Sequence, residues 1–214
     1  GRDKTVWIWE VIDDFVEFDC ISVLNGHTQD VKCVQWHPTM EMLLSASYDD
    51  TIRSWVEDID DWYCADIARV HSSTVWSISL SSTGSHLASV SDDLDMVISK
   101  LIMKESDESN QIQWTDNDKK FLWKEAARLK DIHTRTIYAV DWSKSGSELI
   151  ATACGDDAIR IFGLKEGSSL GDAAPQFELK CDLLNAHETD VNCVAWNPAD
   201  PTLLASASDD SFVN

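Results

Sequence analysis

The sequence has few basic residues and no long apolar run. Only 17 lysines and arginines stand against 38 aspartates and glutamates, so the formal net charge at pH 7 is −21. Because nucleic acids and anionic membranes are bound mainly through lysine and arginine, this balance argues against both as partners. No apolar run approaches the roughly 18–20 residues of a membrane helix, and no basic-then-apolar leader opens the chain. We therefore predict a soluble protein whose partners are other proteins.

Clustered cysteines are also absent. The six cysteines form no Cys-x-x-Cys pair and no Cys/His set with metal-ligand spacing. Cys33 and Cys193 stand at equivalent places in two similar segments, where small buried apolar side chains are expected. The sequence therefore predicts free structural thiols, no metal site and no cofactor. Free thiols favour a reducing compartment, so we expect the protein in the cytoplasm, with the nucleus as a further location.

Internal repetition is the main positive feature. Asn-Gly-His-Thr-Gln-Asp-Val at 25–31 recurs as Asn-Ala-His-Glu-Thr-Asp-Val at 185–191. Turn aspartates fall at positions 3, 49, 93, 156 and 210, in steps of 46, 44, 63 and 54 residues. Between them lie short runs rich in Val, Ile, Trp and Thr, which alternate with period two and end in turn residues. Repeats of about 40–45 residues with four strands each are typical of the WD40 β-propeller.

We accordingly predict an all-β fold, a fragment of a seven-bladed WD40 propeller with three full blades and two half-blades over residues 1–214. The sequence starts without methionine, and we expect the first blades to be missing. The predicted units are a trailing half-blade at 1–25, blades at 26–69, 70–129 and 130–184, and a leading half-blade at 185–214. Polar insertions at 102–122 and 163–176 account for the longer steps and are expected to be mobile surface loops.

The recurring His, Ser or Thr, and Asp residues are interpreted as structural. A buried histidine can bridge a turn aspartate and a serine hydroxyl, and through that hydroxyl a tryptophan indole, which ties the strands of one blade together. A catalytic triad would occur once, whereas this set recurs at fixed offsets, so no catalytic residue is predicted. Because Ser99 and Phe162 stand where tryptophan is expected, two of these networks should stop short. The predicted structural residues are His27, Ser45, Asp49, Trp55, His71, Ser89, Asp93, His133, Thr152, Asp156, His187, Ser206 and Asp210.

A protein-binding face is predicted where the loops enter the innermost strands. Its positions lie three and five residues after each repeat histidine and just before each turn aspartate. Exposed arginine, tryptophan and tyrosine are the residue types that most often dominate binding energy at protein interfaces. The predicted top-face residues are Arg2, Asp30, Lys32, Tyr48, Thr74, Trp76, Asp92, Thr136, Tyr138, Gly155, Asp190, Asn192 and Asp209.

Several longer strings resemble one particular WD40 family. They include Arg-Asp-Lys-Thr-Val-Trp-Ile-Trp-Glu at 2–10, Ser-Ala-Ser-Tyr-Asp-Asp-Thr at 45–51, Thr-Ala-Cys-Gly-Asp-Asp-Ala-Ile-Arg at 152–160 and Asp-Val-Asn-Cys-Val-Ala-Trp-Asn-Pro at 190–198. These closely resemble the WD40 subunit of the cytosolic iron–sulfur protein assembly (CIA) targeting complex.

The resemblance implies a seven-bladed, non-catalytic scaffold that helps to deliver preformed clusters to cytosolic and nuclear apoproteins. Its partners would be a small acidic subunit, a large helical-repeat subunit and the iron–sulfur client proteins, and Arg2 would be the family's surface arginine. Animal members carry Leu-Tyr-Arg where this chain has Ser54-Trp55-Val56, which puts a co-chaperone contact at that element in doubt.

Two other functions compete with this interpretation. Another WD40 adaptor, such as a ubiquitin-ligase substrate receptor, is the main alternative. The Trp-Asp-x-Arg motif usual in such receptors is missing, since the equivalents are Trp9-Glu-Val-Ile and Trp55-Val-Glu-Asp. An enzyme is disfavoured because there is no singular catalytic set, Gly-rich phosphate loop or metal cluster.

Overall fold

The computed structural model describes residues 1–12, 17–59, 61–103 and 120–213. Within these ranges every regular element is a β-strand, as predicted, and no helix could span a membrane. The strands are β1 (Thr5–Ile12), β2 (Glu17–Asn25), β3 (Val31–Trp36), β4 (Met42–Ser47), β5 (Ile52–Asp58), β6 (Asp61–Ala68), β7 (Val75–Leu80), β8 (His86–Ser91), β9 (Met96–Met103), β10 (Phe121–Leu129), β11 (Ile137–Trp142), β12 (Ile150–Cys154), β13 (Ile159–Leu164), β14 (Phe177–Leu183), β15 (Val191–Trp196) and β16 (Leu204–Ser208).

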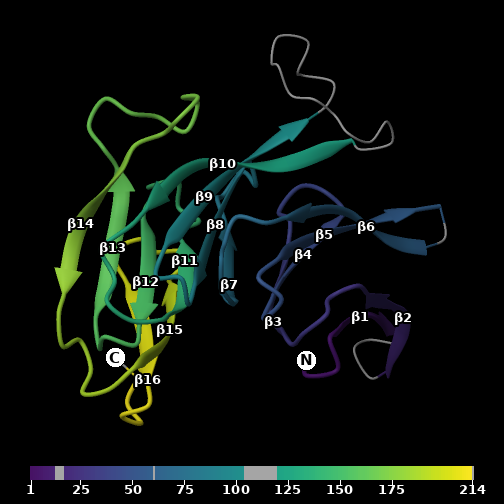
Figure 1. Cartoon of the computed structure of the whole chain (residues 1–214), viewed down its shortest axis with the longest axis horizontal. Helices are drawn as coiled ribbons and strands as arrows, with labels where there is room; N and C mark the ends of the chain where they lie inside the picture. Colours follow the sequence, from purple (N-terminus) through teal and green to yellow (C-terminus); the bar gives the residue numbers. More distant parts are fainter. Residues whose placement is uncertain (13–16, 60, 104–119, 214) are drawn as a thin grey trace.

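The strands form five antiparallel sheets. Three are four-stranded, in the orders β3-β4-β5-β6, β7-β8-β9-β10 and β11-β12-β13-β14, and each lies within one predicted blade. Two are two-stranded, β1-β2 and β15-β16. The first strands of successive sheets, β3, β7, β11 and β15, contact one another, so the sheets stand side by side like the blades of a propeller. By these contacts β1-β2 and β15-β16 are the first and last sheets of the row; in Figure 1 β1-β2 lies at the right and β15-β16 overlaps the β11–β14 sheet.

The hydrophobic core consists of separate clusters between neighbouring sheets. Leu44 and Leu80 belong to the cluster between the β3–β6 and β7–β10 sheets, and Ile98 and Trp142 to the next one. Further clusters join β1-β2 and β15-β16 to their neighbouring four-stranded sheets. Burying one leucine side chain contributes about 1.5–3 kcal/mol, so stacking of sheet on sheet is the main source of stability.

A regular series of hydrogen bonds crosses between sheets. These bonds join the first strands of successive sheets, β3, β7, β11 and β15. In each case the side chain of the fifth residue of one strand accepts a hydrogen bond from the backbone N–H of the sixth residue of the next. The bonds run from Leu80 to Gln35 (3.0 Å), from Trp142 to Ser79 (2.9 Å) and from Trp196 to Asp141 (2.7 Å). These bonds set the register between neighbouring sheets, and the sequence repeat gave no sign of them because the three acceptors differ in type.

The predicted limits are wrong at both ends of the first insertion and at the start of the second. Ile102 and Met103 belong to β9 and pair with Leu122 and Phe121 of β10, while residues 104–119 lie outside the described residues. Phe121 is buried, and packing of such apolar residues extends the hairpin into a segment that looks polar in sequence. Gly163 and Leu164 are likewise the last residues of β13.

The second insertion folds back on itself after β13. The Asp172 carboxylate accepts bonds from the Ser168 hydroxyl (2.9 Å) and from the Ser169 amide (2.8 Å) and hydroxyl (3.0 Å). Leu170 packs against the core cluster between the β7–β10 and β11–β14 sheets. The mobility expected for this loop stays a prediction.

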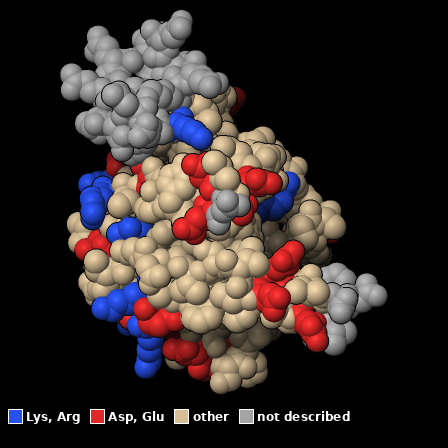
Figure 2. Space-filling model, turned by 90° about the vertical axis from the view of Figure 1, so that its right-hand side faces the viewer, with Lys and Arg blue, Asp and Glu red and all other residues tan. Residues whose placement is uncertain are grey.

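The six cysteines are free thiols, as predicted. Cys33 is partly buried and packs against the core, but the expected burial of Cys193 is wrong. Cys193 is exposed on β15, because no described sheet packs against that face. Figure 2 faces the end of the molecule that carries β1, β2 and the β5–β6 hairpin, and it shows groups of Asp and Glu side chains around a broad uncharged surface.

Candidate protein-binding face

The repeat histidines lie inside the sheets and connect their strands. His27 is hydrogen-bonded through Nδ1 to Asp49 (2.9 Å) and through Nε2 to the Ser45 hydroxyl (2.7 Å), which also accepts the Trp55 indole N–H (2.8 Å). Because a carboxylate only accepts and an indole N–H only donates, His27 Nδ1 carries the proton and Ser45 donates to Nε2. The network spans the loop before β3, strand β4, the following turn and strand β5.

Burial determines the protonation state of this network. Desolvation lowers the pKa of His27, so its imidazole is neutral near pH 7. Burial alone would raise the pKa of Asp49, but hydrogen bonds from Thr51, the Thr28 amide and His27 outweigh it and lower that pKa to about 2. A neutral histidine held by a charged aspartate suits a structural connector of strands.

Two other histidines repeat the arrangement in shorter form. His71 is bonded to Asp93 (2.9 Å) and Ser89 (2.8 Å), and the network ends there as predicted, because the buried Ser99 hydroxyl has no partner among the described residues. In the last sheet, β15-β16, His187 is bonded to Asp210 (2.8 Å) and Ser206 (2.8 Å).

The β11–β14 sheet departs from the predicted pattern. His133 is bonded to Thr152 (2.9 Å), but its Nδ1 has no partner among the described residues, so the expected link from His133 to Asp156 is wrong. Asp156 pairs instead with the buried Arg160 guanidinium (2.9 Å). A permanent cation competes better for a carboxylate than a neutral imidazole does. Burial, and then the Arg160 charge, lower the pKa of His133 to about 4.

The predicted top-face aromatic residues come together in a single row with a charged residue at each end. We call this row the aromatic stripe: Lys32, Tyr48, Trp76, Tyr138 and Asp190. The rings of Tyr48 and Trp76, and those of Trp76 and Tyr138, meet edge to face, with centroids 5.2 Å apart in both pairs. Lys32 Nζ lies 3.7 Å from the Tyr48 ring centroid at one end. At the other end, the Tyr138 hydroxyl donates to Asp190 (3.3 Å). The stripe crosses three four-stranded sheets and reaches β15-β16.

Carboxylates hold the stripe in place. One oxygen of Asp92 accepts both the Trp76 indole N–H (2.8 Å) and the Thr136 hydroxyl (2.7 Å), which joins two neighbouring sheets. Arg135 Nη1 donates to Asp190 at 3.0 Å. Burial, and then the Asp190 charge, raise the pKa of Tyr138, which keeps its hydroxyl protonated as a donor. The rings are therefore ordered before any partner binds.

The other predicted top-face residues lie beside the stripe or apart from it. Asp30 pairs with Lys32 (3.8 Å), and Asn192 donates to Asp209. A Cβ added to Gly155 would lie 3.1 Å from the Tyr138 ring, so the glycine allows close approach. The backbone carbonyl of Thr74 accepts the Asp92 amide (3.1 Å). Arg2 is exposed in the turn before β1, with no side-chain contact described to the stripe.

Sequence reasoning missed Arg135. This residue lies two positions after His133, outside the positions that the repeat rule selects, and its side chain also reaches the Gly155 carbonyl. Only its contact with Asp190, across the gap between two sheets, reveals it as part of this face.

The repeat histidines, serines and aspartates act as hydrogen-bonded connectors between strands. The repeat histidines, serines and aspartates are distributed over separate sheets, and the histidines and serines are buried. Within the described ranges no three His, Cys, Asp or Glu side chains are grouped so as to hold a metal ion. The aromatic stripe, in contrast, is partly exposed and offers rings, hydroxyls and carboxylates to a partner.

Comparison with known proteins supports this description. The family model "WD domain, G-beta repeat" (WD40) matches residues 18–55, 62–97, 127–162 and 179–214. The chain is similar to a protein of Aedes aegypti named "Probable cytosolic iron-sulfur protein assembly protein Ciao1", with 45% identity over 165 residues, 76% of this chain and 47% of the relative.

Two further relatives are similar over different lengths. The Mus musculus protein named "Probable cytosolic iron-sulfur protein assembly protein CIAO1" is 54% identical over 91 residues, which are 42% of this chain and 26% of the relative. The Chaetomium globosum protein named "Probable cytosolic iron-sulfur protein assembly protein 1" is 28% identical over 246 residues, 92% of this chain and 52% of the relative.

The chain thus spans about half the length, or less, of the curated relatives that it matches. The resemblance that the sequence strings predicted is confirmed by these relatives. Since the repeat model covers more than half of the chain and the strands form the expected four-stranded sheets, the chain belongs to the WD40 repeat family.

Proposed function

We propose that the chain is part of a non-catalytic scaffold for cytosolic iron–sulfur protein assembly, which brings together the proteins that deliver clusters to cytosolic and nuclear apoproteins. The observation that carries the proposal is the 45% identity over 165 residues to a protein named for that process. The partners would be protein subunits of the CIA targeting complex and their iron–sulfur clients. The protein would act in the cytoplasm and also in the nucleus, within a seven-bladed ring.

The arrangement of polar side chains supports a scaffold rather than an enzyme. His27 and Ser45 are buried and fully engaged in joining strands, and the same set recurs around His71 and His187. A catalytic serine and histidine must instead reach a substrate.

The top face is the proposed contact surface. Trp76 and Tyr138 are partly exposed and held by Asp92 and Asp190, so a partner would pay little ordering entropy to bind them. We propose that Arg2 and the remaining predicted top-face residues border this contact.

Affinity capture of the full-length protein, followed by mass spectrometry, tests the proposal. The expected result is recovery of iron–sulfur assembly subunits and cluster-requiring enzymes. A Trp76→Ala, Tyr138→Ala double variant should lose part of that set. A Glu41→Gln, Glu166→Gln control, altered at exposed residues away from the stripe, should keep it. Recovery of ubiquitin-ligase subunits without any iron–sulfur protein would contradict the proposal and favour the alternative adaptor.

A further inference from the structure

The aromatic stripe already contains a cation–π contact. Lys32 Nζ lies 3.7 Å from the Tyr48 ring centroid and 5.1 Å from that of Trp76, while Asp30 lies 3.8 Å from the same nitrogen. An ammonium or guanidinium group is attracted to an aromatic face, and most strongly to tryptophan. The chain's own lysine therefore shows which charge this surface stabilises.

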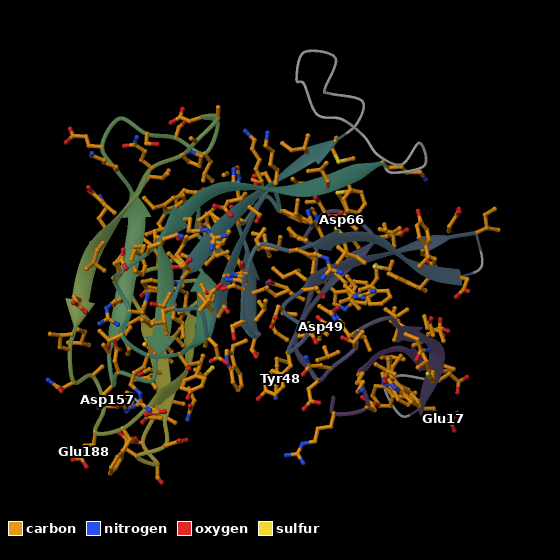
Figure 3. The ribbon with its side chains drawn as sticks, viewed as in Figure 1. Glu17, Tyr48, Asp49, Asp66, Asp157 and Glu188 are labelled. Carbon is orange, nitrogen blue, oxygen red and sulfur yellow. The ribbon has the colours of Figure 1, made fainter. Side chains whose placement is uncertain are left out.

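The surroundings of the stripe are acidic. The carboxylates of Asp30, Asp92 and Asp190 contact stripe residues, and Asp209 lies next to Asp190, whose backbone carbonyl accepts the Asp209 amide (3.2 Å). Lys32 and Arg135 are each paired with one of these carboxylates, and the exposed Arg2 is a further cation of the predicted face. Further acidic residues follow in the adjacent turns, and Figure 3 shows Tyr48, Asp157 and Glu188 on the same lower side of the molecule.

We propose that the aromatic stripe binds a basic peptide segment of a partner protein, with at least one arginine side chain laid against Trp76 and Tyr138. A guanidinium stacks on aromatic rings and also donates to carboxylates, so it matches both components of this surface. The net charge of −21 favours approach of a basic segment and opposes an acidic one. The inference rests on the proposed function in using the same face, and it adds the chemical class of the partner.

Asp92 is the positioning residue of this site. One of its carboxylate oxygens, Oδ1, accepts hydrogen bonds from both the Trp76 indole N–H and the Thr136 hydroxyl. The indole ring therefore cannot turn freely toward or away from a ligand. Order of this kind lowers the entropic cost of binding.

The test uses the full-length protein and an acetylated, amidated octapeptide of alternating glycine and arginine at about 150 mM salt, where long-range attraction is screened. The matched peptide has glutamate in place of arginine. Calorimetry measures both affinities, and ¹H–¹⁵N spectra follow the Trp76 indole resonance. We expect the arginine peptide to bind and to shift that resonance, and the glutamate peptide to do neither.

Paired variants separate a site from general attraction. Asp30→Asn with Asp209→Asn removes two charges beside the stripe, and Glu41→Gln with Glu166→Gln removes two exposed charges elsewhere. The first pair should weaken binding about fivefold and the second less than about twofold. Trp76→Phe should also weaken binding about fivefold while the spectrum stays dispersed. Equal losses in the two pairs, equal binding of the glutamate peptide or an unmoved Trp76 resonance would each overturn the inference.

Failure of this inference differs from failure of the proposed function. Capture of iron–sulfur proteins that depends on Trp76 and Tyr138, without arginine-peptide binding, would refute only the inference. Arginine-peptide binding at the stripe, without iron–sulfur proteins in the capture, would refute only the proposed function.

Discussion

Replacing Ser45 by alanine tests the structural role of the repeat histidines. The Ser45 hydroxyl is completely buried and lies between His27 Nε2 (2.7 Å) and the Trp55 indole N–H (2.8 Å). Without it, one buried acceptor and one buried donor lose a partner, and water cannot reach either group easily. Each such orphaned group costs about 1–3 kcal/mol, so we expect Ser45→Ala to lower the free energy of unfolding by about 2–6 kcal/mol.

The chain supplies a matched control in Ser99. This residue is also a strand serine, with an exposed fraction of 1%, but its hydroxyl has no partner among the described residues. Ser99→Ala removes a buried polar group that gains nothing from its surroundings, so it should leave stability unchanged or raise it slightly. The same chemical change is thus expected to destabilise the protein at Ser45 but not at Ser99.

Urea unfolding followed by circular dichroism measures both variants. For a chain of this size, a loss of about 2–6 kcal/mol corresponds to a fall in Tm of roughly 4–24 °C. Hydrogen exchange of amides in β4 and β5 checks that the effect is local to this sheet, which matters because repeat proteins can unfold in parts. A similar loss in the two variants, or a loss below about 0.5 kcal/mol for Ser45→Ala, would refute the idea that these hydroxyls act as connectors.

Three further perturbations follow from the structure. Gly84 has φ +76°, and a Cβ there would lie 2.3 Å from the His37 ring, whereas Gly146 has φ +77° with nothing within 4 Å. Gly84→Ala should therefore lower the melting temperature by more than Gly146→Ala does. Equal melting temperatures of the two variants would contradict this prediction. Asp141→Ala removes the acceptor of the Trp196 amide, so amide hydrogen exchange should become faster in β15 and β16 while β3 to β6 keep their protection. Exchange rates in β15 and β16 equal to those of the unaltered chain would count against a stabilising role of this bond. Burial lowers the pKa of His86 and His133 from 6.5 to about 4, with further contributions from Lys100 at His86 and from Arg160 at His133. Between about pH 4 and 6.5 the unfolded chain therefore binds more protons than the folded chain does. Urea unfolding should show that the free energy of unfolding falls as the pH drops from about 6.5 toward 4. That fall should be smaller in His133→Gln, and an identical profile would show that His133 is not the titrating group.

Features set by local sequence were predictable. The period of the turn aspartates and the alternation of Val, Ile and Trp determined the strands, because side-chain alternation and turn chemistry act over a few residues. The networks of His27, His71 and His187 also followed from spacing, since each closes within one repeat. Even the early end of the network at Ser99 could be read from residue type, because a serine cannot replace an indole donor across that distance.

Contacts between repeats could not be predicted in this way. Tyr48, Trp76 and Tyr138 come from three different sheets, and only the stacking of those sheets brings them into one row. The replacement of His133 by Arg160 as the partner of Asp156 depends on which donor lies within bonding distance, which spacing along the chain does not specify. By itself the sequence determined the repeating unit and the hydrogen bonds within it. The tertiary structure decided which side chains of neighbouring units meet, because these contacts depend on the register and packing of one sheet against the next.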